Sequence, residues 1–135
     1  MLIRFDPSAG IEAAIDAGSL PKGMNMSDVR TLKIRNLNDA FRTTLEGGKA
    51  FITPGVSALG PEFSARALGE VRAFAAFSPE NDLYGEHDFG ALSIADEKLF
   101  WKIDYYDLSM DFGSKDPADP MQTTRVLTIL LAEEW

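Results

Sequence analysis

The chain has 135 residues, no cysteine, and 21 acidic against 13 basic residues, which give a formal net charge of −8. This length is typical of one domain with its own core. The lack of cysteine excludes disulfide scaffolds, thiolate zinc sites and cysteine nucleophiles, and it favours a cytoplasmic protein. No apolar run reaches the roughly 18 residues that would span a bilayer, so we expect no membrane segment.

The negative charge is concentrated in one segment. Residues 1–79 hold nine bases and eight acids, residues 80–119 hold three bases and eleven acids, and residues 120–135 hold one base and two acids. The segment 80–119 therefore carries a charge equal to that of the whole chain. Nucleic acid is a poor ligand for this segment, because a polyanion binds through Lys and Arg. A protein partner with a basic surface, a cation or a polar catalytic site fits better.

The first half of the chain is predicted to be mainly helical. Glycines and prolines interrupt residues 1–26, so we expect a leader there, outside a single domain over 27–135. Ser27 as N-cap and apolar residues at helical spacing predict a helix over 27–46, which Gly47 and Gly48 end. A β-prone run predicts a strand over 49–53, and Pro61 begins a second helix.

The second half is predicted to contain a hairpin over about 88–106, with a two-residue turn at Asp96 and Glu97. In that register the residue numbers of opposed partners sum to 193, and His87 lies opposite Tyr106 and diagonal to Asp104. The segment 121–135 is expected to be a helix because its leucines and valine follow helical spacing, with a strand as the alternative. The sequence thus predicts an α+β fold, a small antiparallel sheet packed against two or three helices.

His87 is the only histidine and the natural residue for proton transfer near neutral pH. On the predicted hairpin it shares one face with Asp104, Tyr106 and Lys102, which makes these four the candidate catalytic residues of a small hydrolase-type enzyme. The alternative is a hydrogen-bonded structural histidine in a hairpin that has no site.

Metal binding is a further alternative, because Glu86, His87 and Asp88 offer suitable ligands. Adjacent strand residues point to opposite faces, so the three converge only in a loop. We therefore predict no cofactor and keep a divalent metal as an alternative.

Several acids of the segment 80–119 form a candidate binding surface: Asp82, Glu86, Asp88, Asp107 and Asp111. Since the sequence contains no complete catalytic or nucleotide-binding motif, the leading interpretation is a small acidic interaction or regulatory module, inhibitor-like, that presents carboxylates to a basic partner. The sequence does not indicate an oligomeric state.

Several blocks of the sequence resemble one bacterial family. They are Asn38-Asp39-Ala40-Phe41-Arg42, Thr53-Pro54-Gly55-Val56, Gly85-Glu86-His87-Asp88-Phe89-Gly90, Phe100-Trp101-Lys102-Ile103-Asp104-Tyr105-Tyr106-Asp107 and Thr124-Arg125-Val126-Leu127-Thr128-Ile129. Over about residues 28–135 the chain resembles the family named domain of unknown function 3768. The resemblance implies an accessory role on mobile elements such as plasmids or phages, and it implies no activity. Where the family tends to have proline after Asn81-Asp82, this chain has Leu83.

Overall fold

A computed structural model describes residues 25–135 of the chain. Its elements follow in the order α2 (Met26–Thr44), β1 (Gly48–Ile52), α3 (Pro54–Ser57), α4 (Pro61–Arg72), β2 (Phe89–Ile94), β3 (Glu97–Tyr106), β4 (Thr124–Leu131) and the 3₁₀ helix η1 (Ala132–Glu134). The expected leader, residues 1–26, lies outside the described residues except for its last two positions.

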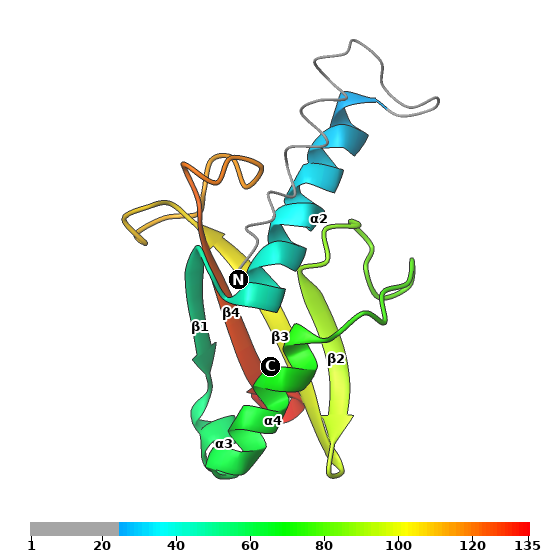
Figure 1. Ribbon diagram of the computed structural model, residues 1–135, viewed down its shortest axis with the longest axis vertical. Helices are drawn as coiled ribbons and strands as arrows, with labels where there is room; N and C mark the ends of the chain where they lie inside the picture. The colour runs from blue at the N-terminus through cyan, green and yellow to red at the C-terminus, as the bar shows by residue number, and fades with distance from the viewer. Residues whose placement is uncertain (1–24) are drawn as a thin grey trace, which may run out of the picture.

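The four strands form one sheet in the order β1-β4-β3-β2. The β2–β3 and β3–β4 pairs are antiparallel and the β1–β4 pair is parallel, so the sheet is mixed. Figure 1 shows α2 and α4 on the same side of this sheet. The predicted α+β fold, with a hairpin packed against helices, is confirmed.

The long helix α2 is delimited by local signals at both ends. It begins at an Asn25 cap, whose side chain accepts from the amide of Asp28 while the Asp28 carboxylate accepts from the amide of Asn25. The N-cap is therefore Asn25, two residues before the expected Ser27. The helix ends where Leu45 takes a left-handed conformation, φ 61°, and Gly47 follows at φ 86°.

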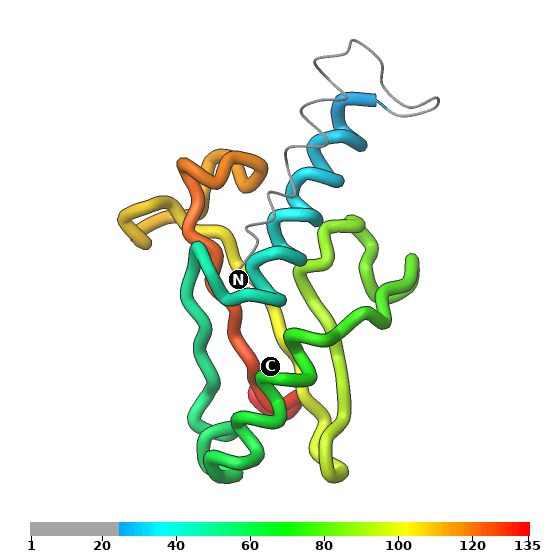
Figure 2. The backbone as a smooth tube through the Cα atoms, viewed as in Figure 1, coloured from blue at the N-terminus to red at the C-terminus, as the bar shows by residue number. Residues whose placement is uncertain are grey.

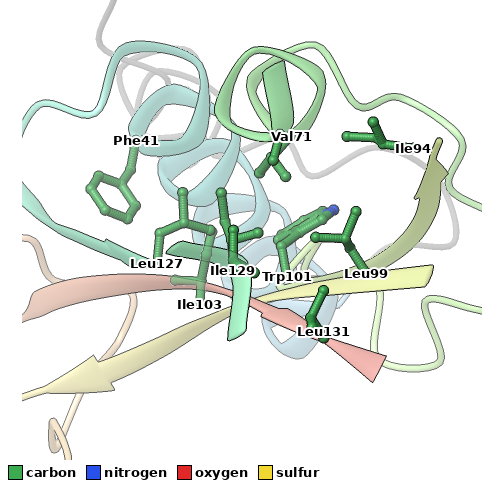
Figure 3. Packing of buried hydrophobic residues seen from close by; sticks show 11 residues of the cluster. Phe41, Val71, Ile94, Leu99, Trp101, Ile103, Leu127, Ile129 and Leu131 are labelled. Carbon is green, nitrogen blue, oxygen red and sulfur yellow. The ribbon is translucent and has the colours of Figure 1, made fainter. Parts of the chain in front are cut away.

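The core lies between the helices and the sheet. Trp101 of β3 is fully buried, together with Leu127 of β4 and Val71 of α4, and Phe41 of α2 closes the same cluster (Figure 3). Trp101 packs so closely against β2 that a Cβ added at Gly90 would clash with its indole ring. A glycine is therefore required at this position of the hairpin.

The hairpin register differs from the predicted one. Phe89 pairs with Lys102 and Ile94 with Glu97, so opposed residues sum to 191 rather than 193. The turn is Ala95-Asp96, not Asp96-Glu97, and both turn residues have positive φ, 49° and 67°, as a type I′ turn requires. The shift of two residues keeps the predicted apolar face but changes every cross-strand pair.

The expected helix over 121–135 is wrong, because residues 124–131 form the central strand β4. Strand β4 is buried on both of its faces, so its apolar residues do not alternate with polar ones. Val126 and Leu130 are buried on one face while Leu127 and Ile129 are buried on the other. The resulting run satisfies helical spacing as well as strand pairing.

Two long loops lie at the same end of the sheet. The α4–β2 loop, residues 73–88, leads into the start of β2, and the β3–β4 loop, residues 107–123, joins the end of β3 to the start of β4. Since β2 and β4 both run antiparallel to β3, the start of β2, the end of β3 and the start of β4 lie at the same end of the sheet. Figure 2 shows both loops toward the end of the molecule from which α2 projects.

Candidate functional site

His87 sits at the end of the α4–β2 loop, between two carboxylates. Its Nδ1 lies 2.9 and 3.0 Å from the two carboxylate oxygens of Asp39 on α2, and its Nε2 lies 3.5 Å from Oδ2 of Asp82. The imidazole stacks face to face on Phe77, with ring centroids 3.7 Å apart. His87 itself has φ 54°, so the chain changes direction here before β2 begins. The site is therefore built by one helix and one loop.

Asp39 also joins the histidine to a buried arginine. Nη2 of Arg42 lies 3.2 Å from Oδ1 of Asp39, and Nη1 donates to the carbonyl oxygens of Val71 and Arg72, the last residues of α4. A cation at a helix C-terminus interacts favourably with the helix dipole. Only 3% of the Arg42 side chain is exposed, so the Asp39 carboxylate supplies the negative charge that this buried cation requires.

A second polar cluster lies directly beside this site and ties both loops to the fold. We call it the Asn38 network, and it consists of Asn38, Tyr105, Glu86 and Arg125. The amide nitrogen of the fully buried Asn38 donates to the carbonyl oxygen of Glu86 (2.9 Å) and to the hydroxyl of Tyr105 (2.8 Å), and its oxygen accepts from Nε of Arg125 (2.7 Å). Tyr105 in turn donates to the carboxylate of Glu86 (2.8 Å).

The Asn38 network reaches the second loop through Arg125, whose Nη2 donates to the carbonyl oxygen of Pro117. Burial disfavours the charged form of each group. It therefore lowers the pKa of Arg125, whose charged form is the protonated one, and raises the pKa of Tyr105, whose charged form is the deprotonated one. Tyr105 therefore remains a neutral hydroxyl at physiological pH. One buried asparagine thus fixes the α4–β2 loop at Glu86 and the β3–β4 loop at Pro117.

An open pocket of about 420 Å³ lies next to His87. Its lining includes the charged side chains of Arg35 and Asp82 and the aromatic rings of Phe77 and Tyr84. Nε of Arg35 donates to the carbonyl oxygen of Gly85, which holds the α4–β2 loop against α2. The pocket can therefore accept a small polar group beside the imidazole.

The predicted grouping of His87 with Asp104 and Tyr106 is wrong. His87 contacts Asp39 on the face covered by the helices, whereas Lys102, Asp104 and Tyr106 alternate with the buried residues of β3 and so lie on the opposite face. The left-handed backbone at His87 breaks the alternation on which the prediction depended. Lys102 and Asp104 instead form an ion pair with each other, 2.9 Å between Nζ and Oδ2.

The proposed metal ligands do not converge. Within residues 25–135 no group of three or more His, Asp or Glu side chains is arranged to hold a metal ion. His87 is held by two other carboxylates and Glu86 by Tyr105. Burial raises the pKa of Asp88, and the neighbouring charge of Glu86 raises it further.

The five acids of the predicted binding surface serve several roles. Asp82 contacts His87 and Glu86 belongs to the Asn38 network. The Asp107 carboxylate accepts a hydrogen bond from the Ser109 hydroxyl and another from the amide of Asp111, and these bonds lower its pKa. The acids are therefore divided between the α4–β2 loop and the β3–β4 loop, and part of their negative charge orders these loops.

Large apolar side chains are exposed in the same two loops. Leu83 and Tyr84 in the α4–β2 loop are each 79% exposed. The β3–β4 loop exposes Leu108, Phe112 and Met121, between 65% and 78%. Isolated exposed apolar residues are common on protein surfaces, but loops held by a rigid scaffold are also where binding residues concentrate.

Sequence reasoning missed Asp39, Phe77 and Asn38 as site residues. Asp39 lies 48 positions before His87, and no local pattern connects a helix residue to a loop at that separation. The signal that was present is the block Asn38-Asp39 within the family resemblance, which marks both residues without stating a role. Without that resemblance, two polar residues on the core-facing side of a helix only interrupt its apolar pattern and do not indicate a site.

The fold and the site define a small α+β protein that holds a histidine between two carboxylates at one end of a mixed sheet. A family model described as a protein of unknown function (DUF3768) matches residues 52–134. The chain belongs to this family, as the sequence blocks predicted, and the match includes His87 and both loops. No curated protein and no solved structure matches the chain. Among the described residues, no helix is long and apolar enough to cross a membrane.

Proposed function

We propose that this protein is an interaction module that binds a partner protein with a basic surface through the α4–β2 and β3–β4 loops, and that it regulates the partner by covering that surface. The observation that carries the proposal is the gathering of exposed apolar side chains and carboxylates in two loops at one end of the sheet.

The composition of the loops fits a protein interface. Residues 73–88 contain four acids and no Lys or Arg, and residues 107–123 contain four acids and one Lys. Exposed aromatic, methionine and leucine side chains supply apolar contact area, and Tyr in particular is enriched among residues that dominate binding energy. Carboxylates around such residues favour a basic partner and speed its association.

The Asn38 network supports the proposal by reducing the flexibility of both loops. Glu86 and Pro117 are each held by a buried side chain, through hydrogen bonds to their carbonyl oxygens. A surface that is ordered before binding loses less conformational entropy when the partner docks. Without the hydrogen bonds to Glu86 and Pro117, the same loops would bind a partner more weakly even if they made the same contacts with it.

The proposal is tested by capture of host proteins on the immobilised protein at low and high salt. We expect a discrete basic partner at low salt, which weakens as salt screens the carboxylates. Tyr84→Ser and Phe112→Ser should each reduce capture at least tenfold. Leu59→Ser removes an exposed apolar side chain, 40% exposed, from the α3–α4 turn and serves as the matched control. Equal capture by all three variants would contradict the proposal.

Acid–base catalysis at His87 is a second candidate function. The observation that favours it is the close contact between Asp39 and Nδ1 of His87 beside an open pocket lined by Arg35. A carboxylate in this position orients an imidazole for proton transfer. Hydrolysis of aryl ester and aryl phosphate substrates would test it. Activity that is lost in both His87→Gln and Asp39→Asn, while each variant stays folded, would support catalysis, and activity unchanged in His87→Gln would exclude it.

A further inference from the structure

Among the residues that the structure describes, strand β2 (Phe89–Ile94) is at an edge of the sheet, with no strand on its outer side (Figure 1). The carbonyl oxygen of Asp88 accepts from the amide of Ile103, so alternate residues from Asp88 onward bond to β3. The N–H and C=O groups of Phe89, Ala91 and Ser93 therefore point away from the sheet. Among the described residues these groups have no hydrogen-bond partner.

The edge lacks the features with which proteins usually prevent strand addition. Residues 89–94 contain no charged residue and no proline, and Ala91 and Ser93 are exposed. The opposite edge strand β1, in contrast, contains Lys49, and only Thr53 separates it from α3, which begins at Pro54. The β1 edge therefore carries features that hinder the addition of another strand, and the β2 edge does not.

We propose that two copies of this chain associate through β2, in antiparallel pairing about a twofold axis at Ala91. In this arrangement Ala91 faces its own counterpart, and Phe89 of each copy faces Ser93 of the other. The three outward residues of each strand then form three hydrogen-bonded pairs, which satisfies all of their free backbone groups. The result is a continuous sheet of eight strands.

A second copy fits this edge better than an unrelated peptide because the edge is complementary to itself. The three outward residues are symmetric about Ala91, whose small side chain avoids a clash at the axis. No like charges of β2 oppose each other across the seam. On the outer face of the sheet, Trp135 packs on Phe89 and Phe100 yet stays 70% exposed, and a neighbouring sheet would extend this aromatic surface.

The charge of the chain gives the association a recognisable salt dependence. Two copies with a formal charge of −8 each repel one another, so added salt should strengthen the dimer. Binding of a basic partner should weaken under the same change. The opposite salt dependence distinguishes the dimer through β2 from the binding of a basic partner, so either proposal can be refuted without the other.

Cysteine cross-linking tests the register, because the chain has no cysteine of its own. We expect Ala91→Cys to form a covalent dimer with a short bifunctional thiol reagent, since the paired Cα atoms lie about 5.5 Å apart. Ser93→Cys, exposed on the same strand, is the matched control, because the Cα atoms of its two copies would lie about 15 Å apart. Equal cross-linking of both variants, or of neither, would overturn the proposed pairing.

Sedimentation measurements on the full chain test the association itself. The wild type should shift from monomer toward dimer as its concentration rises to about 1 mM, since a small edge interface is weak. Ala91→Lys should weaken the dimer at least tenfold, although it lowers the net negative charge. Ala65→Lys, at an exposed position of α4, makes the same change of charge and should leave the dimer intact. A wild type that stays monomeric throughout would refute the proposal.

Discussion

Asn38→Ala is the change that tests the buried polar network most strongly. The side chain is fully buried and makes three hydrogen bonds, to Glu86, Tyr105 and Arg125. Alanine leaves two neutral groups and one guanidinium nitrogen without this partner. Neutral hydrogen bonds contribute about 1 kcal/mol and bonds to a charged group about 1.5–3 kcal/mol, so the expected loss is about 3–5 kcal/mol.

This loss is a large fraction of the stability of a domain, which is about 5–15 kcal/mol. It corresponds to a fall in Tm of roughly 10–18 °C for a chain of this size. Urea unfolding followed by the fluorescence of the buried Trp101 would measure it. Hydrogen exchange should also become faster in both loops, because Asn38 and Arg125 hold them at Glu86 and Pro117.

The control for Asn38→Ala is Thr43→Ala on the same helix. The Thr43 hydroxyl is exposed and bonds only to carbonyl oxygens of its own helix, so its loss should change the free energy of unfolding by less than about 0.5 kcal/mol. A loss below about 1 kcal/mol for Asn38→Ala, or unchanged exchange in the β3–β4 loop, would refute the role of the network.

Three further changes test the site and the fold. Asp39→Asn should destabilise the protein by about 2–4 kcal/mol in urea unfolding, since Arg42 then remains buried without a negative partner. Gly90→Ala should cost about 1–3 kcal/mol in the same assay because its Cβ would meet the Trp101 indole. Asp107→Asn should speed amide exchange in the β3–β4 loop at pH 7. The lowered pKa of Asp107 means that its contribution is present above the ordinary value of 3.8 and disappears as the pH falls through the folded value, so wild type and variant should converge in acid.

Each of these changes has an outcome that would count against the structure. Gly69→Ala is the matched glycine control, because an added Cβ there meets nothing within 4 Å, and it should stabilise α4 by about 0.5–1 kcal/mol. Equal effects of Ala at positions 69 and 90 would show that Trp101 does not pack against β2. An Asp39→Asn variant as stable as the wild type would place Arg42 in solvent rather than in the core.

Helices α2 and α4 and the existence of the hairpin could be predicted because local signals specify them. Glycine at the end of α2, proline at the start of α4 and alternating polarity in β3 act over a few residues. Strand β4 could not be recognised by alternation, because this strand, unlike β3, is buried on both faces. Its parallel pairing with β1 depends on residues more than 70 positions apart.

The site was located only in part. The sequence singles out His87 because it is the only histidine, and its candidate roles remain predictions. The predicted neighbours of His87 are wrong because its left-handed backbone turns the side chain toward α2, while the earlier hairpin turn changes the cross-strand pairs but not the face. The role of Asp39 follows from the packing of that helix, which no spacing along the chain encodes. The association with mobile elements remains a prediction from the family resemblance.

The central claim is that the two loops at one end of the sheet form the surface that binds a basic partner. A photo-cross-linking residue placed at the position of Tyr84 or Phe112 in the full chain, irradiated in host lysate at low salt, tests it most directly. We predict the same discrete cross-linked protein from both positions, attached near its lysines and arginines, and none from the control position of Leu59. Identical labelling from all three positions, or labelling that high salt does not reduce, would contradict the claim.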